Sequence, residues 1–152
     1  SAITDAVKAG AIIVTAAGNY RRDVSRTYPA GCLGVVAVAA SDINGNLASY
    51  SGYGPGVTIM APGGDFNGNP AKTGVLTAIR RDYHYNKGTS FSAPIVSGVL
   101  ALWLAARPSL SNEELIAIMK KASKRRDSVQ CPLLCGAGLL NAFPFASMPI
   151  VP

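Results

Sequence analysis

A long apolar segment that begins just after Gly88-Thr89-Ser90 constrains this chain more than any other feature. The segment from Ser92 to Ala106 predicts a helix that protein surrounds on all sides, ended by Arg107-Pro108. Ser90 would then stand at the helix start, where unpaired backbone N–H groups and the helix dipole favour negative charge. Taken alone, Ser90 is interpreted as the N-cap of a core helix. The alternative is a nucleophile whose oxyanion the helix start stabilises.

A second candidate lies at the end of a predicted buried strand. The residues from Ala11 to Ala17 form a continuous apolar run, typical of a parallel sheet, and Gly18-Asn19 follows them. Ligands of open α/β sheets bind at the carboxyl ends of the strands. The Asn19 amide is therefore placed to donate to a carbonyl oxygen that becomes negative in acyl transfer. The alternative is a plain turn, since Gly-Asn is also common turn chemistry.

The remaining elements predict an α/β fold. Further strands are expected from Gly34 to Ala40 and from Val57 to Ala61. Between these two, Asn44-Gly45 predicts a hairpin turn with positive φ at both residues. Helices are expected from Ser1 to Ala9 and after the capping box that starts at Ser111.

Together these segments resemble the subtilisin-like serine proteases, the subtilases. The nucleophile motif of that family is met at each of its specified positions, by Gly88, Thr89, Ser90, Ser92, Pro94, Ser97 and Gly98. The segment Ala16 to Asn19 resembles the family's oxyanion-hole segment. Other similar segments are Tyr28-Pro29-Ala30, Ala48 to Ser51, Met60 to Gly63 and Gly136 to Ala142, so the resemblance covers nearly the whole chain.

The resemblance implies a parallel-sheet, three-layer subtilisin-like fold and a serine endopeptidase. Ser90 would be the nucleophile, and Asn19 with the Ser90 backbone N–H would hold the oxyanion. Ala16, Ala17 and Gly18 would edge the substrate pocket, and the substrate would be a polypeptide. Subtilases often carry calcium in loops whose carbonyl ligands leave no sequence signature, so calcium stays open. The sequence itself shows no complete calcium or zinc cage.

Members of the family use Asp, His and Ser in that chain order, with Asp and His far upstream of the oxyanion Asn. Here the segment before Asn19 is too short to hold them, so we expect residues 1–152 to be the C-terminal portion of a catalytic domain. The N-terminal portion, as a separate chain, would supply Asp and His. His84 precedes Ser90 closely, in a polar strand, and is interpreted as structural or solvated. The alternative function is a non-catalytic binding or scaffold domain.

The charge and the apolar segments argue against two classes of partner. The net charge of +6 comes largely from Lys120, Lys121, Lys124, Arg125 and Arg126 at a predicted helix end. Cations there complement the helix dipole. Aromatic residues do not alternate with these basic residues, so the pattern does not indicate nucleic-acid binding. The apolar stretch from Ala93 to Ala106 falls short of the roughly 20 residues of a membrane span.

The chain has 3 cysteines, an odd number. Cys131 and Cys135 are spaced for a small-loop disulfide, which leaves Cys32 paired outside the chain or free. A disulfide predicts a secreted or otherwise extracytoplasmic protein.

Overall fold

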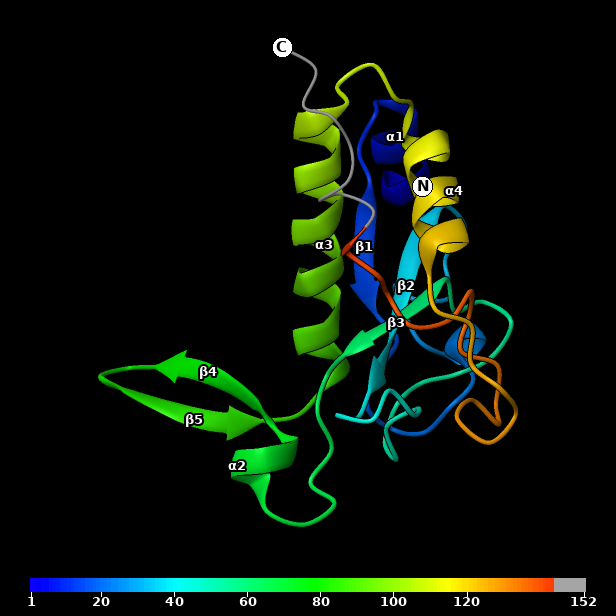
Figure 1. Cartoon of the computed structure of the whole chain (residues 1–152). Coiled ribbons are helices and arrows are strands. Elements are labelled where there is room, and N and C mark those ends of the chain that lie inside the picture. The colour runs from blue at the N-terminus through cyan, green and yellow to red at the C-terminus, as the bar shows by residue number, and fades with distance from the viewer. Residues whose placement is uncertain (144–152) are drawn as a thin grey trace.

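The computed structural model describes residues 1–143, which form a parallel three-stranded sheet with helices packed against it (Figure 1). The strands are β1 (Ile13–Ala16), β2 (Val35–Ser41) and β3 (Ile59–Pro62), in the order β1-β2-β3. The helices are α1 (Ala2–Lys8), α2 (Pro70–Thr73), α3 (Thr89–Ala106) and α4 (Asn112–Ala122), with a 3-10 turn at Val24–Arg26. All three predicted strands are present, which confirms the α/β class with a parallel sheet.

The central strand β2 is buried on both faces, as its continuous apolar sequence requires. Val36 and Val38 face α3 and α4, in a core cluster that contains Trp103 and Met119. The alternate residues of β2 enter a second cluster with Val24, Val57 and Cys135 from the loops. The sheet therefore separates a helical layer from a layer of loops, and its register is fixed by two distinct cores.

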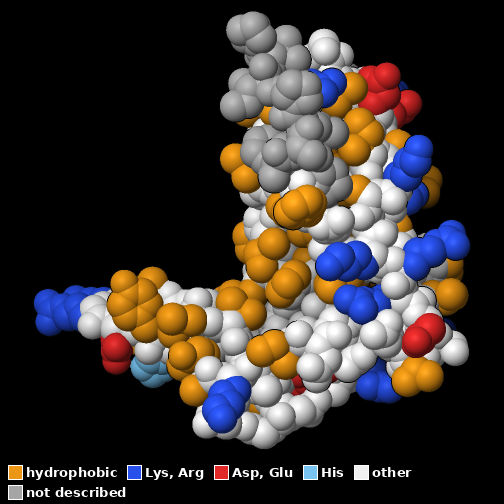
Figure 2. Space-filling view, in the orientation of Figure 1, with side chains coloured by type: hydrophobic (Ala, Val, Ile, Leu, Met, Phe, Trp, Pro, Cys, Tyr) orange, Lys and Arg blue, Asp and Glu red, His pale blue; other side chains and the backbone are white. Residues whose placement is uncertain are grey.

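Helix α3 is not surrounded by protein in this structure, contrary to the sequence-based prediction. One face packs on the sheet through eight buried residues: Thr89, Ser92, Ala93, Val96, Val99, Leu100, Trp103 and Ala106. On the other face Leu102 is 54% exposed and Leu104 is 40% exposed. By length and composition alone α3 could cross a membrane, a test that core helices of soluble proteins also pass. Figure 2 shows the exposed apolar side chains gathered along it.

A hairpin of β4 (Val75–Ile79) and β5 (Asp82–Asn86), which sequence analysis did not anticipate as a pair, projects from the body of the molecule (Figure 1). Its register places Leu76 opposite Tyr85 and Ala78 opposite Tyr83, so one face of the hairpin is apolar. Polar and apolar residues alternate in β5, and Thr77 interrupts the apolar residues of β4, so neither strand has the continuous apolar run that is typical of the core strands.

The turn after β2 differs from the predicted two-residue hairpin turn. Gly45 has a φ of 79°, but Asn44 is not among the residues with positive φ. The Asp42 carboxylate instead accepts hydrogen bonds from the backbone N–H groups of Asn44 (2.9 Å) and Asn46 (2.8 Å). This side chain closes a longer loop, which lets Ser41 pair with Leu47.

Candidate active site

Ser90 lies in the first turn of α3, which begins at Thr89, three residues before the predicted start. The residue is exposed, while its neighbours Gly88 and Thr89 are buried. Within residues 1–143, neither the Ser90 Oγ nor its backbone N–H makes a hydrogen bond. A free hydroxyl and a free N–H at a helix start can meet a carbonyl group that approaches from solvent.

Thr89 joins the helix start to the end of β1. The Asn19 Oδ1 accepts from the Thr89 backbone N–H at 2.9 Å and from the Thr89 hydroxyl at 2.8 Å. The same hydroxyl accepts from the Gly18 backbone N–H at 3.1 Å. Because two donors hold the Asn19 carboxamide oxygen, its Nδ2 group faces the other way and remains available as a donor. Sequence analysis missed this role of Thr89, although Thr89 is part of the matched motif.

Gly88 shows where the two predicted site residues converge. A Cβ atom built on Gly88 would lie 3.0 Å from the Ser90 Oγ and 3.4 Å from the Asn19 Nδ2. Both polar atoms therefore lie close to the same point, and a side chain at position 88 would crowd both of them. The structure thus brings Ser90 and Asn19 together from opposite ends of a long sequence interval.

The three residues predicted to edge a substrate pocket lie at the end of β1. Ala17 is fully buried, whereas Ala16 and Gly18 are partly exposed. Gly18 has a φ of 98°, which favours glycine. Its N–H bonds to Thr89, and its carbonyl accepts from the Gly52 N–H at 2.8 Å. The Gly18 backbone is thus occupied within the chain, and a role of these residues in substrate binding stays a prediction.

His84 lies on β5 of the projecting hairpin, apart from the site. Its Nε2 is 3.8 Å from the Asp82 carboxylate, and the two side chains are 60% and 70% exposed. Its backbone carbonyl accepts from the Thr77 hydroxyl, which helps to hold the hairpin. Among the hydrogen bonds of residues 1–143, none joins His84 to Ser90.

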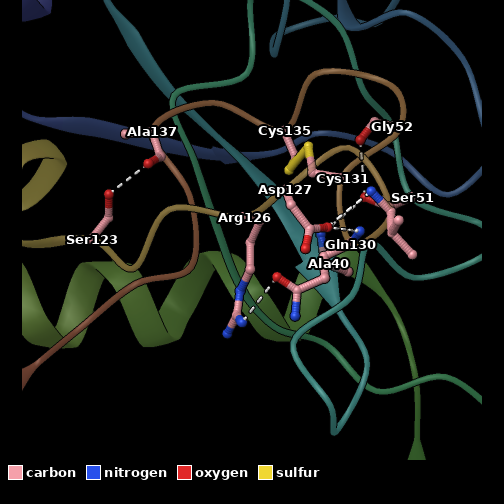
Figure 3. Close-up of a disulfide and its surroundings, with 11 residues drawn as sticks. Ala40, Ser51, Gly52, Ser123, Arg126, Asp127, Gln130, Cys131, Cys135 and Ala137 are labelled. Atoms are coloured by element: carbon pink, nitrogen blue, oxygen red, sulfur yellow. Dashed lines mark hydrogen bonds between the residues drawn. A yellow bond between two sulfur atoms is a disulfide. The ribbon is translucent and has the colours of Figure 1, made fainter.

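The predicted disulfide joins Cys131 to Cys135 in the loop layer (Figure 3), and Cys32 is free within the part of the chain that the structure describes. No group of three or more His, Cys, Asp or Glu residues that could hold a metal gathers among the described residues. A cavity of about 750 Å³ lies beside the disulfide and is lined by Lys120, Lys121, Arg125 and Arg126. Ser90 does not line this cavity.

Tyr50 supports the loop that precedes Ser90. Its hydroxyl lies 2.9 Å from the Gly63 carbonyl oxygen and 2.7 Å from that of Gly64, to which it donates. Burial of the phenol raises its pKa far above the usual value, so the hydroxyl stays protonated as a donor. Gly63 in turn accepts from the Gly88 N–H at 2.9 Å.

An α/β domain that presents a free serine at a helix start beside an asparagine at a strand end has the arrangement of a serine hydrolase. The model of the subtilase family matches residues 1–138, and this chain belongs to that family.

Similar proteins agree with this assignment. The "Extracellular protease" of Xanthomonas campestris pv. campestris is 37% identical over 93% of this chain, which spans 24% of that protein. "Subtilisin BL" of Lederbergia lenta is 35% identical over 93% of this chain, which spans 48% of it. A solved protease structure from Pseudoalteromonas arctica matches with a TM-score of 0.86 and 34% identity, over 96% of this chain and 45% of that one. The chain thus spans less than half the length of each of these relatives.

Proposed function

We propose that this chain carries the nucleophile and the oxyanion hole of a serine endopeptidase. The observation that carries the proposal is the convergence of the Ser90 Oγ and the Asn19 Nδ2 around Gly88. A scissile carbonyl placed there would have the hydroxyl at its carbon and the amide at its oxygen. The substrate would be a polypeptide, in keeping with the family.

In this mechanism the Ser90 Oγ attacks the carbonyl carbon as its proton passes to a histidine. The tetrahedral oxyanion accepts hydrogen bonds from the Asn19 Nδ2 and the Ser90 backbone N–H. The histidine returns the proton to the leaving amine as the peptide C–N bond breaks, which leaves an acyl-enzyme on Ser90. Water then hydrolyses the ester by the same steps, and Ser90 is regenerated.

The histidine and the aspartate that orients it would come from a part of the catalytic domain outside this sequence, either as a separate chain or as part of a longer one. Without a base, the Ser90 hydroxyl stays protonated at neutral pH and is a weak nucleophile. The exposed apolar face of α3 supports this proposal, because a helix without charged residues is normally covered on both sides. The strand β1, at the edge of the sheet, also has one side without a neighbouring strand among the described residues.

We also propose a location and a metal for this protein. An extracytoplasmic location is supported by the Cys131–Cys135 disulfide and by relatives named as extracellular proteases. Calcium bound by backbone carbonyls remains a proposal from the family resemblance.

The second candidate function is a non-catalytic domain that keeps the subtilase frame. The presence of both Ser90 and Asn19, exposed and facing one point, favours the protease.

The test uses the full-length protein with all its segments. Ser90→Ala should abolish labelling by an organophosphonate, which phosphonylates an activated serine. Asn19→Ala should still fold, with some loss of stability because two Thr89 donors lose their acceptor. It should leave KM nearly unchanged and lower kcat by about 10²–10³-fold, the cost of one oxyanion donor. Peptide cleavage that survives Ser90→Ala would show that Ser90 is not the nucleophile, and a wild-type protein that is neither labelled nor active on peptides would favour the scaffold function.

A further inference from the structure

An ion pair with a buried carboxylate lies just before the nucleophile loop. The Lys87 Nζ is 3.3 Å from the Asp65 Oδ1, and the Asp65 side chain is only 2% exposed while that of Lys87 is 35% exposed. The other oxygen of Asp65 accepts the Ser49 backbone N–H at 2.5 Å. Removing the lysine would leave the buried carboxylate of Asp65 without its compensating charge, so the carboxylate draws the Lys87 ammonium toward it.

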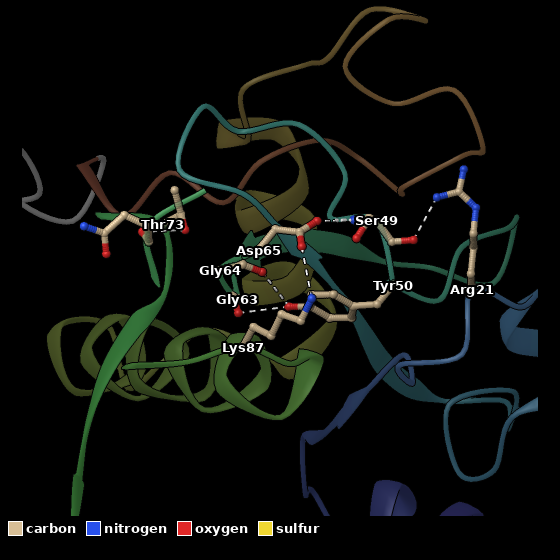
Figure 4. A network of polar contacts seen from close by, with 9 residues as sticks. Arg21, Ser49, Tyr50, Gly63, Gly64, Asp65, Thr73 and Lys87 are labelled. Atoms are coloured by element: carbon tan, nitrogen blue, oxygen red, sulfur yellow. Dashed lines mark hydrogen bonds and ion pairs between the residues drawn. The ribbon is translucent and has the colours of Figure 1, made fainter. Parts of the chain in front are cut away.

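Two aromatic rings fix the position of the lysine further. The Lys87 Nζ lies 5.1 Å from the centre of the Tyr50 ring and 5.2 Å from that of Phe66. A cation at this range is attracted to the ring faces. Figure 4 shows Lys87 extended beside Tyr50 toward Asp65, with Gly63 and Gly64 next to them. The charged end of Lys87 is therefore held by one carboxylate and two rings.

The same contacts reach the oxyanion side of the site. The Arg21 N–H donates to the Tyr50 carbonyl at 2.8 Å, and the Arg21 Nη1 donates to the Ser49 carbonyl at 2.7 Å. Arg21 follows Asn19 by two residues, and Lys87 precedes Ser90 by three. With the Thr89–Asn19 hydrogen bonds, these contacts connect the segment before Ser90 to the segment after Asn19.

We propose that Lys87 and Asp65 are positioning residues, which hold the Gly88-Thr89-Ser90 loop at the correct distance from Asn19. The inference rests on the proposed protease function. Its physical reason is that Gly88 has no side chain, so the start of the loop is held by the bond from its N–H to the Gly63 carbonyl and by its neighbours along the chain. The ion pair anchors the residue immediately before that loop. A change of about 1 Å in the position of a reacting group can lower a rate about 10²-fold.

The test compares variants of the full-length protease. Lys87→Met keeps the length of the side chain and removes its charge, and it should lower kcat and the rate of organophosphonate labelling by about 10- to 100-fold. KM should change little, because neither side chain touches the substrate. Lys87→Arg should restore most of the rate. Lys72→Met, on the exposed helix α2, is the matched control and should behave as the wild type.

A double variant keeps the inference testable if Lys87→Met does not fold. Asp65→Asn with Lys87→Met leaves no buried charge unpaired, so it should fold, yet it should show the same loss of kcat. If the wild type itself is not labelled, the proposed function fails. If the wild type is labelled and these variants react at the wild-type rate per folded molecule, the ion pair is merely structural and the inference is wrong.

Discussion

At the scale of single residues, Thr89 is the clearest example of a side chain whose task depends on the fold. It is 1% exposed, and its hydroxyl donates to the Asn19 Oδ1 and accepts from the Gly18 N–H. A motif can show that threonine stands beside the serine. The motif does not show that its partner lies 70 residues earlier in the chain. Only the packing of α3 against β1 makes that contact.

Thr89→Val replaces the hydroxyl by a methyl group of similar size. We expect it to lower the stability by about 1–3 kcal/mol, because the Gly18 N–H loses its partner in a buried place. It should also lower kcat, because the Asn19 amide loses one of the two bonds that orient it. Thermal unfolding and steady-state kinetics measure the two effects. Thr89→Ser keeps the hydroxyl and is the control. Equal kcat values for Thr89→Val and the wild type would contradict the role of Thr89 in orienting Asn19.

At the scale of elements, α3 has two faces with different surroundings. Its inner face packs on all three strands, and its outer face exposes Ile95, Leu102 and Leu104. The hairpin of β4 and β5 also presents an apolar face, and isolated two-stranded hairpins are marginally stable in water. Both faces are the kind of surface that a further part of a domain covers.

Leu102→Glu in the full-length protease tests that interpretation. If the outer face of α3 is covered there, the buried charge should destabilise the protein by about 2 kcal/mol or more. Leu33→Glu is the control, since Leu33 is 92% exposed. Its effect should stay within about 0.5 kcal/mol. Equal melting temperatures for the two variants would mean that the outer face of α3 stays in contact with water.

At the scale of the whole molecule, the sequence predicted the sheet well because each core strand is a short apolar run bounded by Gly, Pro or Asn. The position of β2, at Val35–Ser41, differs from the prediction by one residue at each end. Ser90 and Asn19 could be predicted as site residues because the sequence places one at a helix start and the other at a strand end. The Lys87–Asp65 pair could not be predicted in this way, because the two residues lie 22 positions apart and meet only through the folded loops.

The same pair gives the molecule a predictable response to acid. Burial raises the pKa of Asp65, but the hydrogen bonds from Ser49 and the Lys87 cation outweigh this and hold it below its ordinary value of 3.8. The carboxylate therefore stabilises the fold fully above pH 3.8, and this contribution is lost as the pH falls through the lower pKa of the folded state.

Melting temperatures over a pH series, measured in a Ser90→Ala background to prevent self-digestion, test this response. At neutral pH the protein with Asp65 should have a higher melting temperature than the protein with Asp65→Asn. The difference should shrink in acid, as the carboxylate takes up its proton. A difference that stays constant at all pH values would contradict the charged role of Asp65.

The 70-residue interval between Asn19 and Thr89 also affects when the candidate site assembles during folding. Contacts between distant parts of a chain, and parallel sheets in particular, form slowly during folding. The serine and the asparagine meet only after β1 and α3 have docked on each other. Under the proposed function, a polypeptide that is still folding therefore lacks the assembled centre and cannot yet cleave other chains.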